Sequence, residues 1–378
     1  MLRLVYRQLM LDPLRTALTC VAIAAVVAVI LVLEGFNEGQ MRQLRLAVLN
    51  RGADLFVVQA GIANMTVARS ILPQSSRQDV EAVDGVKIAH PLTGISVIYE
   101  YEQDDRRSPM FLLVYDSGGG VEHLAEGEVP HGEREIVIDR SLAERYDLGV
   151  GDPFVLSDFE FRISGISQGA AAFFTSFGFA RYDDLIDFYF ESDLAADITT
   201  FPLLSFLLVD LDDGADPGAV AEEIESTVPS VDVFLPETLA DKDEALGRAL
   251  FGPIMRLLVT VGYVIGVLVI GIVMFAAVNA RRRDFGVLKA LGFSNAFLGA
   301  SVLMEAMVLV TVAIPLGVAL AWLIGRGIEA SMPLYLILAT EPVALLRTVA
   351  ACMVLGVAGA LAPVGLIRRV DPDIVFRS

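Results

Sequence analysis

The sequence contains few of the residues that organise catalytic or disulfide-bonded proteins. Only two cysteines occur among 378 residues, and both lie in apolar runs, which excludes a disulfide framework. The three histidines, His90, His123 and His131, are scattered and lack the spacing of metal ligands. The motifs GxxxxGK[ST] and HExxH are absent. We therefore expect no catalytic residues, no metal and no cofactor on this chain.

The chain also lacks the positive charge that a nucleic-acid-binding surface needs. Its net charge is −19, although 55% of its residues are hydrophobic. Residues 37–250 hold 39 of the 47 acidic residues and 15 of the 28 lysines and arginines, a balance of −24. A basic face cannot be assembled from this composition, so nucleic-acid binding is excluded. The distribution instead indicates a soluble acidic domain within a hydrophobic, slightly basic frame.

The residues on either side of the acidic domain contain long apolar runs. Four of them are long enough to cross ~30 Å of hydrocarbon as helices. They cover Thr16–Leu33, Leu257–Ala280, about 296–324 and about 349–367. A cleaved secretory signal is the alternative for the first run, but that run exceeds the usual ~7–15 apolar residues and has no small-residue cleavage motif. We predict four transmembrane helices, one before and three after the acidic domain.

Positive residues near the ends of the spans predict the orientation in the membrane. Ten lysines and arginines flank the spans on one side, whereas the short loop between spans three and four carries only Arg326. The ten are Arg3, Arg7, Arg15, Arg281, Arg282, Arg283, Lys289, Arg368, Arg369 and Arg377. Because such residues mark the cytoplasmic side, we expect both termini in the cytoplasm and residues 37–250 outside the plasma (inner) membrane.

The sequence of the acidic insert, residues 37–250, predicts an α+β domain. Runs typical of strands cover 53–59, 86–99, 110–115, 154–157, 161–166, 203–209 and 231–235. Helical patterns cover 75–83, 141–146, 183–189, 216–228 and 236–250. Its end segments, 37–50 and 238–256, continue into spans one and two, either as levers or as rigid tethers.

One apolar segment of the insert, residues 169–178 (GAAAFFTSFG), has two interpretations. It forms either a strand pair of the core or an exposed patch for a substrate or partner, in which Phe173, Phe174 and Phe177 make the contacts.

The segment between spans two and three, Arg281–Ser294 (RRRDFGVLKALGFS), predicts a short amphipathic helix that ends at Gly292. Phe285, Leu288 and Leu291 form its apolar stripe. On the cytoplasmic face such a helix either docks into a groove of a partner or lies on lipid.

Two further features lie within the spans. Glu305 is an ionisable residue in span three, for which we favour pairing with a nearby arginine such as Arg283 over a proton-relay role. Small residues at four-residue spacing predict close helix packing, either within one chain, which we favour for span three, or between two chains, which is an option for span two. These residues are Gly262, Gly266, Ala313, Gly317, Ala321 and Gly325.

These motifs resemble those of the FtsX/MacB-type (type VII) ABC transporter permeases. The similarity lies first in the segment between spans two and three, through Arg282, Arg283, Asp284, Phe285, Gly286, Leu288, Lys289, Ala290, Leu291 and Gly292. It extends to the entry Leu9–Leu18, to the outer-domain pattern SLAERYDLGVGD, to Glu305 and to the closing RRVDPDIV. Within the family, ADLFVVQ and the absence of a fused ATPase are most similar to DevC-type exporter permeases.

The resemblance implies the following organisation. Residues 1–36 hold the amphipathic N-terminus and span one, 37–250 a periplasmic α+β domain with stalk helices, and 251–378 spans two to four, in which 281–294 is the ATPase-coupling helix. The chain is then a permease subunit, a homodimer driven by a separate ATP-binding subunit that carries ATP and Mg.

The same resemblance implies export of an amphipathic substrate, such as a glycolipid or lipid, by mechanotransmission. A periplasmic membrane-fusion adaptor and a TolC-like outer-membrane duct are the implied partners besides membrane lipids. The alternative is an FtsX-like regulator that activates an extracytoplasmic partner and transports nothing.

Overall fold

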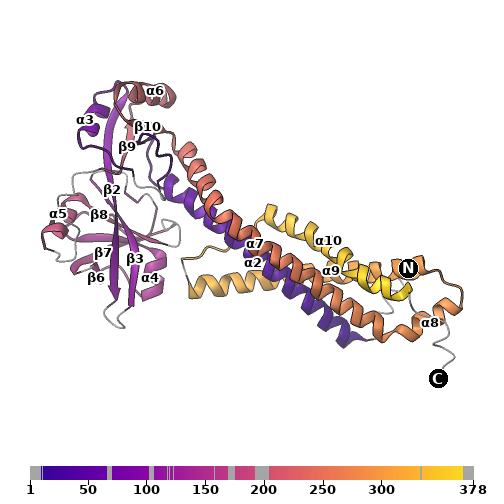
Figure 1. The fold of residues 1–378 in the computed structure, drawn as a ribbon. Helices are drawn as coiled ribbons and strands as arrows, with labels where there is room; N and C mark the ends of the chain where they lie inside the picture. Colours follow the sequence, from indigo (N-terminus) through magenta and orange to yellow (C-terminus); the bar gives the residue numbers. More distant parts are fainter. Residues whose placement is uncertain are drawn as a thin grey trace. The chain divides into compact units, whose positions relative to one another are not determined.

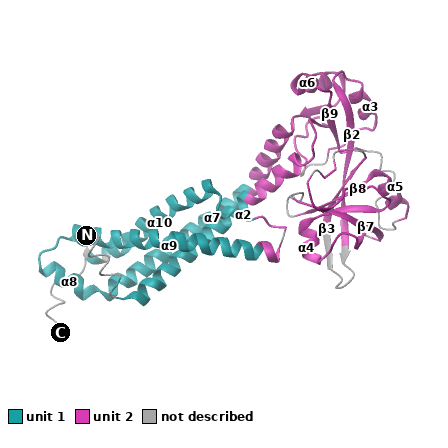
Figure 2. Ribbon diagram, turned by 180° about the vertical axis from the view of Figure 1, so that it is seen from behind, with its two compact units in different colours: residues 1–38, 252–328, 337–378 teal, residues 39–251, 329–336 magenta. Residues whose placement is uncertain are grey.

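The computed structural model describes residues 10, 12–65, 70–101, 106–116, 118, 120–121, 123–156, 158–168, 175–191, 204–332 and 334–368 (Figure 1). The chain divides into two compact units (Figure 2). The first unit consists of residues 1–38, 252–328 and 337–378, and the second of residues 39–251 and 329–336. Assignment of 329–336 to the second unit was not indicated by the sequence.

Four helices are long and apolar enough to cross a membrane, as the hydropathy predicts. They are α2 (Pro13–Leu49), α7 (Pro236–Ala280), α9 (Asn295–Ser331) and α10 (Pro342–Arg368). A fifth helix of this part of the chain, α8 (Arg282–Ala290), is too short to cross. Helices α2 and α7 are each continuous, so that the segments flanking the outer domain belong to the same helices as spans one and two.

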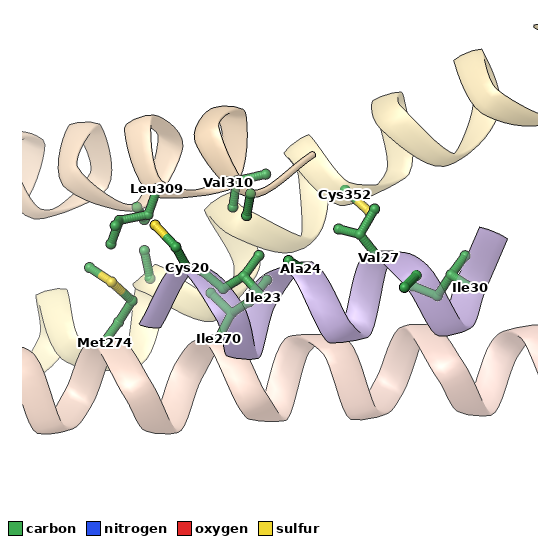
Figure 3. Packing of buried hydrophobic residues seen from close by; sticks show 14 of the residues in the cluster. Cys20, Ile23, Ala24, Val27, Ile30, Ile270, Met274, Leu309, Val310 and Cys352 are labelled. Atoms are coloured by element: carbon green, nitrogen blue, oxygen red, sulfur yellow. The ribbon is translucent and has the colours of Figure 1, made fainter. Parts of the chain in front are cut away.

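In the first unit α2 is packed among the other spans. Ile23, Ala24, Val27 and Ile30 of α2 are buried in one apolar cluster, which also contains Ile270 and Met274 of α7, Leu309 and Val310 of α9, and Cys352 of α10 (Figure 3). Both cysteines of the chain, Cys20 and Cys352, are buried and free.

The segment after α9 packs against α2 at Gly35. The Leu338 N–H donates to the Gly35 carbonyl at 2.9 Å, and a β-carbon at Gly35 would lie 2.5 Å from the Ala339 nitrogen. Beside this contact, the buried carboxylate of Glu34 pairs with Arg347 of α10. One end of the helix bundle is thus closed by a backbone contact and an ion pair.

The second unit contains one ten-stranded mixed sheet. Its strands run in the order β10-β1-β9-β2-β3-β8-β5-β7-β4, and β6 pairs with β2 and β7. Eight pairings are antiparallel, whereas β3 with β8 and β5 with β7 are parallel. The strands are β1 (Leu55–Gln59), β2 (Val86–Tyr101), β3 (Arg106–Tyr115), β4 (Leu124–Gly127), β5 (Glu135–Asp139), β6 (Pro153–Leu156), β7 (Phe159–Ser167), β8 (Ser176–Arg181), β9 (Phe206–Leu211) and β10 (Val231–Phe234).

Alternation along the strands produces two apolar faces, because successive side chains of a strand point to opposite sides. Phe56 and Val58 of β1 lie in the cluster that includes Leu44 of α2 and Leu239 of α7. Leu55 and Val57 lie in the opposite cluster, with residues of α3 (Ser75–Glu81) and α6 (Pro217–Thr227). The second unit therefore has its own core on each side of the sheet.

The other half of the sheet packs against α4 (Arg140–Tyr146) and α5 (Tyr182–Glu191), with Leu142, Tyr146 and Phe188 as their main contacts. The α+β fold class is thus confirmed. Seven strands coincide with the predicted runs. Strand β8 overlaps the end of the segment 169–178, for which a strand pair was one of two interpretations, whereas β4 and β5 were not predicted as strands.

The stalk segments of α2 and α7 belong to this second core. Gly247 of α7 lies so close to α2 that a β-carbon there would come within 2.4 Å of Leu44 Cδ1. Arg45 of α2 forms ion pairs with Glu237 and Asp241 of α7 and lies 4.0 Å from Glu244. Since these carboxylates follow each other at i, i+4 and i+7, they share one face of α7.

Candidate functional site

Helix α8 follows α7 after a single residue, Arg281. It ends in a Schellman motif, in which the Phe293 N–H donates to the Leu288 carbonyl at 3.1 Å and the Gly292 N–H to the Lys289 carbonyl at 2.9 Å. Gly292 has a φ of 92°, which a residue with a β-carbon adopts at a cost. The predicted short helix with a glycine stop is confirmed.

The inner face of α8 is anchored in the helix bundle. Phe285 is 2% exposed within the cluster formed by the spans, and half-buried Leu288 packs against the same cluster. Gly286 is buried beside Phe285. The Lys289 Nζ donates to the Ile367 carbonyl near the end of α10 at 2.7 Å.

The outer face of α8 is exposed and combines apolar and charged groups. Leu291 is 71% exposed, and Val287 and Phe293 are also exposed large apolar side chains. The remaining exposed positions are Arg282, Arg283, Asp284, Ala290 and Gly292.

The predicted single stripe of Phe285, Leu288 and Leu291 is wrong in one respect. Phe285 and Leu288 turn towards the bundle, whereas Leu291 follows the last helical residue and points elsewhere, so it is exposed. The apolar surface available to a partner is formed by Val287, Leu291 and Phe293, of which the prediction included only Leu291.

Glu305 lies inside the bundle and pairs with Arg281. Its Oε1 is 3.2 Å from Arg281 Nη1, and the two side chains are 5% and 16% exposed. The expected partner, Arg283, is exposed on the outer side of α8. The reason is the turn between α7 and α8, which directs the first arginine of the run inward and leaves the next two outside.

The small residues all contact helices or loops of the same chain. A β-carbon at Gly266 would lie 2.9 Å from Val26 of α2, and Gly262 faces Ile30 of the same helix. This position of the α7 glycines contradicts their expected use between two chains. Gly317 faces Val27, and Gly325 faces Ile337 at 3.4 Å. Ala313 and Ala321 are fully buried.

The structure describes part of the apolar segment 169–178 of the outer domain. Phe177 lies in β8, is buried, and contacts the Phe111 ring at a centroid distance of 5.6 Å. It is therefore a core residue and not part of an exposed patch. Phe173 and Phe174 lie outside the described residues.

Several titratable groups of the outer domain have shifted pKa values, among them Tyr115, Asp184 and Glu135. Burial raises the pKa of Tyr115 to about 12. Burial also raises the pKa of Asp184, although the Arg134 N–H at 2.6 Å from its Oδ1 acts in the opposite direction. The N–H groups of Gly132 and His131, both 2.8 Å from the Glu135 carboxylate, lower the pKa of Glu135. In the described part of the chain, no cluster of metal-ligating side chains occurs.

The sequence matches two known families that together span most of the chain. Residues 16–227 match the MacB-like periplasmic core domain, and residues 256–372 match the FtsX-like permease C-terminal domain. The chain therefore belongs to the MacB-like and FtsX-like ABC transporter permeases. The resemblance inferred from its motifs is confirmed at the level of this family.

Relatives that match over nearly their whole length are also described as ABC transporter permeases. The uncharacterized ABC transporter permease Rv0072 of Mycobacterium tuberculosis is 23% identical over 375 residues, covering 96% of this chain and 95% of the relative. The uncharacterized ABC transporter permease Mb2592 of Mycobacterium bovis is 24% identical over 378 residues, with the same coverage of both chains.

Solved structures with similarity to this chain include two outer domains. The periplasmic region of MacB from Actinobacillus actinomycetemcomitans is 12% identical with a TM-score of 0.38, covering 52% of this chain and 95% of that one. The extracellular domain of the transporter YknZ from Gram-positive bacteria is 12% identical with a TM-score of 0.35, covering 48% and 100%.

Proposed function

We propose that this permease couples ATP hydrolysis by a separate ATP-binding subunit to export of an amphipathic substrate by mechanotransmission. The observation that carries the proposal is the construction of α8. Its inner face is fixed by Phe285 in the core of the spans, and its outer face presents apolar and basic side chains together.

The outer face of α8 has the chemistry of a docking helix. Leu291, Val287 and Phe293 offer apolar anchors for a groove, and Arg282 and Arg283 add positive charge beside them. A helix that served only to lie on lipid would have no need of the half-buried Lys289 contact and the buried Phe285 contact that fix its orientation. ATP and Mg would be bound by the partner subunit, which also supplies the catalytic residues.

The interior of the bundle supports mechanotransmission over passage through an aqueous pore. The described spans bury two carboxylates, Glu34 and Glu305, and each is paired with an arginine. The hydroxyl side chains of Thr19, Ser301 and Thr348 are also buried, and the main cluster of the bundle is formed by apolar side chains. A hydrated path for a polar substrate requires polar groups that face a cavity.

The assembly proposed around the chain is a homodimer in the inner (plasma) membrane with both termini in the cytoplasm. The positive residues Arg282 and Arg283 on exposed α8 support this orientation. An adaptor and an outer-membrane duct would complete the export path where an outer membrane exists.

The test is co-purification of the tagged chain in mild detergent, with the recovered proteins identified by mass spectrometry. Wild-type protein should retain a P-loop ATPase. Leu291→Ala should weaken that retention roughly 30-fold, the equivalent of the ~2 kcal/mol typical of an interface hot spot. Leu346→Ala is the matched control, because Leu346 of α10 is 72% exposed and lies near the start of α10, whereas α8 contacts the end of α10 at Ile367.

The recovered partners also separate export from regulation. An adaptor together with the ATPase supports export, whereas a cell-wall hydrolase with the ATPase would favour the FtsX-like regulator. Recovery of no ATPase with the wild-type chain would overturn the coupling role of α8.

A further inference from the structure

Helix α8 is joined to three spans by three different kinds of bond. The chain itself connects it to α7 through Arg281. The Lys289 ammonium holds it to the last turn of α10 through the Ile367 carbonyl at 2.7 Å. The Arg281 guanidinium holds it to α9 through the Glu305 carboxylate at 3.2 Å. A displacement of α8 therefore acts on each of these spans at a separate point.

The ion pair reaches deepest into the bundle. Glu305 lies ten residues beyond Asn295, the first residue of α9, which corresponds to about 15 Å along the helix axis. The link between Lys289 and α10, by contrast, is made at the end of its helix. Of these three links, the ion pair is the one that reaches a point well inside a span.

The surroundings of the Arg281–Glu305 pair oppose separation of its two charges. Both side chains are largely excluded from solvent, and Glu305 is flanked by Ala306 and Leu309 of the apolar cluster. Attraction between opposite charges is much stronger in such a low-dielectric environment than in water. A carboxylate in a span is costly unless a partner compensates its charge, so separation of the pair is strongly opposed.

The pair does not belong to the docking surface. Arg281 is 16% exposed, whereas Arg282 and Arg283 on the outer side of α8 are exposed. A partner that binds Leu291 and Phe293 would leave Glu305 untouched.

We propose that Arg281 and Glu305 are positioning residues that convert displacement of α8 into movement of the interior of span three. This inference rests on the proposed docking of an ATPase to α8. It assigns binding and transmission to different residues: Leu291 and its exposed neighbours bind, and the buried pair transmits.

The experiment measures ATPase retention and permease-stimulated ATP hydrolysis separately, on the full chain in lipid nanodiscs with its co-purified ATPase. The variants are Arg281→Gln, Glu305→Gln and the conservative Arg281→Lys. Glu34→Gln is the matched control, since it breaks the other pair of a buried carboxylate with an arginine, Glu34 with Arg347. Size-exclusion profiles identify any variant that fails to fold.

Arg281→Gln and Glu305→Gln should each retain the ATPase as wild type does but lower the stimulated maximal rate at least about fivefold, with the KM for ATP unchanged. Arg281→Lys, which keeps the charge, and Glu34→Gln should retain most of the stimulation. Should Glu305→Gln misfold, Arg281→Gln and its comparison with Arg281→Lys still decide the matter.

Two results would overturn the inference alone. One is undiminished stimulation in Arg281→Gln and Glu305→Gln, and the other is an equal loss in Glu34→Gln, which would indicate general weakening of the bundle. Failure of the proposed function would give a different result, because no ATPase would then co-purify with the wild-type chain.

Discussion

Gly317 of α9 lies so close to Val27 of α2 that a β-carbon at Gly317 would come within 2.6 Å of Val27 Cβ and 2.9 Å of the Ala24 carbonyl oxygen. Both neighbouring groups belong to or adjoin a helix backbone, so they have little freedom to move aside. We predict that Gly317→Ala destabilises the protein by about 1–3 kcal/mol, the usual cost of overpacking.

Thermal unfolding in detergent checks this prediction. Gly327→Ala in the same helix is the control, because a β-carbon at Gly327 meets no atom within 4 Å. Removal of a glycine from a helix should there raise stability by up to ~1 kcal/mol. Equal losses in both variants would contradict close packing at Gly317.

We predict that Phe285→Ala mainly lowers the stability of the folded protein, and that any effect on ATPase docking is secondary to this loss. Phe285 is buried in the cluster of the spans, and truncation of a buried phenylalanine costs about 3–5 kcal/mol. Leu291→Ala should change stability by less than about 0.5 kcal/mol, because Leu291 is 71% exposed. Unfolding midpoints of both variants provide the measurement. A midpoint for Phe285→Ala equal to that of wild type would mean that α8 is not anchored through this ring.

Asp184 and Glu135 predict pH effects of opposite sign on the outer domain. The folded-state pKa of Asp184 is raised, so its contribution to stability is complete below the ordinary aspartate pKa of ~3.9 and is lost as pH rises through the folded value. The pKa of Glu135 is lowered, so its contribution is present above the ordinary ~4.3 and is lost as pH falls through the folded value.

Asp184→Asn keeps an oxygen for the Arg134 N–H but removes the buried charge, so it should increase protection of α5 at about pH 7. Glu135→Gln should decrease protection of β5 at the same pH. Hydrogen exchange of the full chain, corrected for intrinsic rates, measures both. A change in hydrogen-exchange protection of the same sign in both variants would contradict this prediction.

The outward face of α7 predicts a contact between two copies of the chain. Ile254, Val261, Leu268 and Phe275 recur every seven residues and are all exposed. That spacing is typical of helices packed at a shallow left-handed angle, which is also common in membranes. We predict that Val261→Cys forms a disulfide-linked dimer on oxidation in native membranes, after Cys20 and Cys352 are replaced by alanine.

Val354→Cys is the control for this experiment, because Val354 of α10 is also exposed to the surroundings of the bundle. Cross-linking through position 354 and none through position 261 would place the interface elsewhere.

The helices of the membrane part were predictable because each span is a long uncharged run, and length alone separates such a run from a buried core helix. Strands were predictable where alternation is strong, as in Phe161–Ile166. Strand β8 was not, because GAAAFFTSFG has no alternation and its partners β3 and β5 are distant in the sequence. Strand β4 has the polar sequence LAEG at the edge of the sheet and carries almost no signal.

The position of α8 could be predicted from its basic residues and Gly292, but its inward face could not. Apolar residues occur on both sides of this nine-residue helix, so the sequence does not indicate whether Phe285 or Val287 is buried. The partner of Glu305 depends on the turn at Arg281, which local sequence does not determine. The contacts of Arg45 could have been predicted from the sequence, because Glu237, Asp241 and Glu244 recur at helical spacing on a segment expected to be helical.

The position of β1 in its sheet has a consequence for the biogenesis of the protein. Residues 55–59 are hydrogen-bonded on one side to β9 and on the other to β10, whose last residue is Phe234. During synthesis and translocation, the first strand therefore has neither neighbour until almost the whole insert has crossed the membrane. Loop closure over such a distance is slow and leaves an apolar strand unpaired meanwhile. The outer domain therefore cannot complete its sheet before β10, the strand directly before α7, is available for pairing.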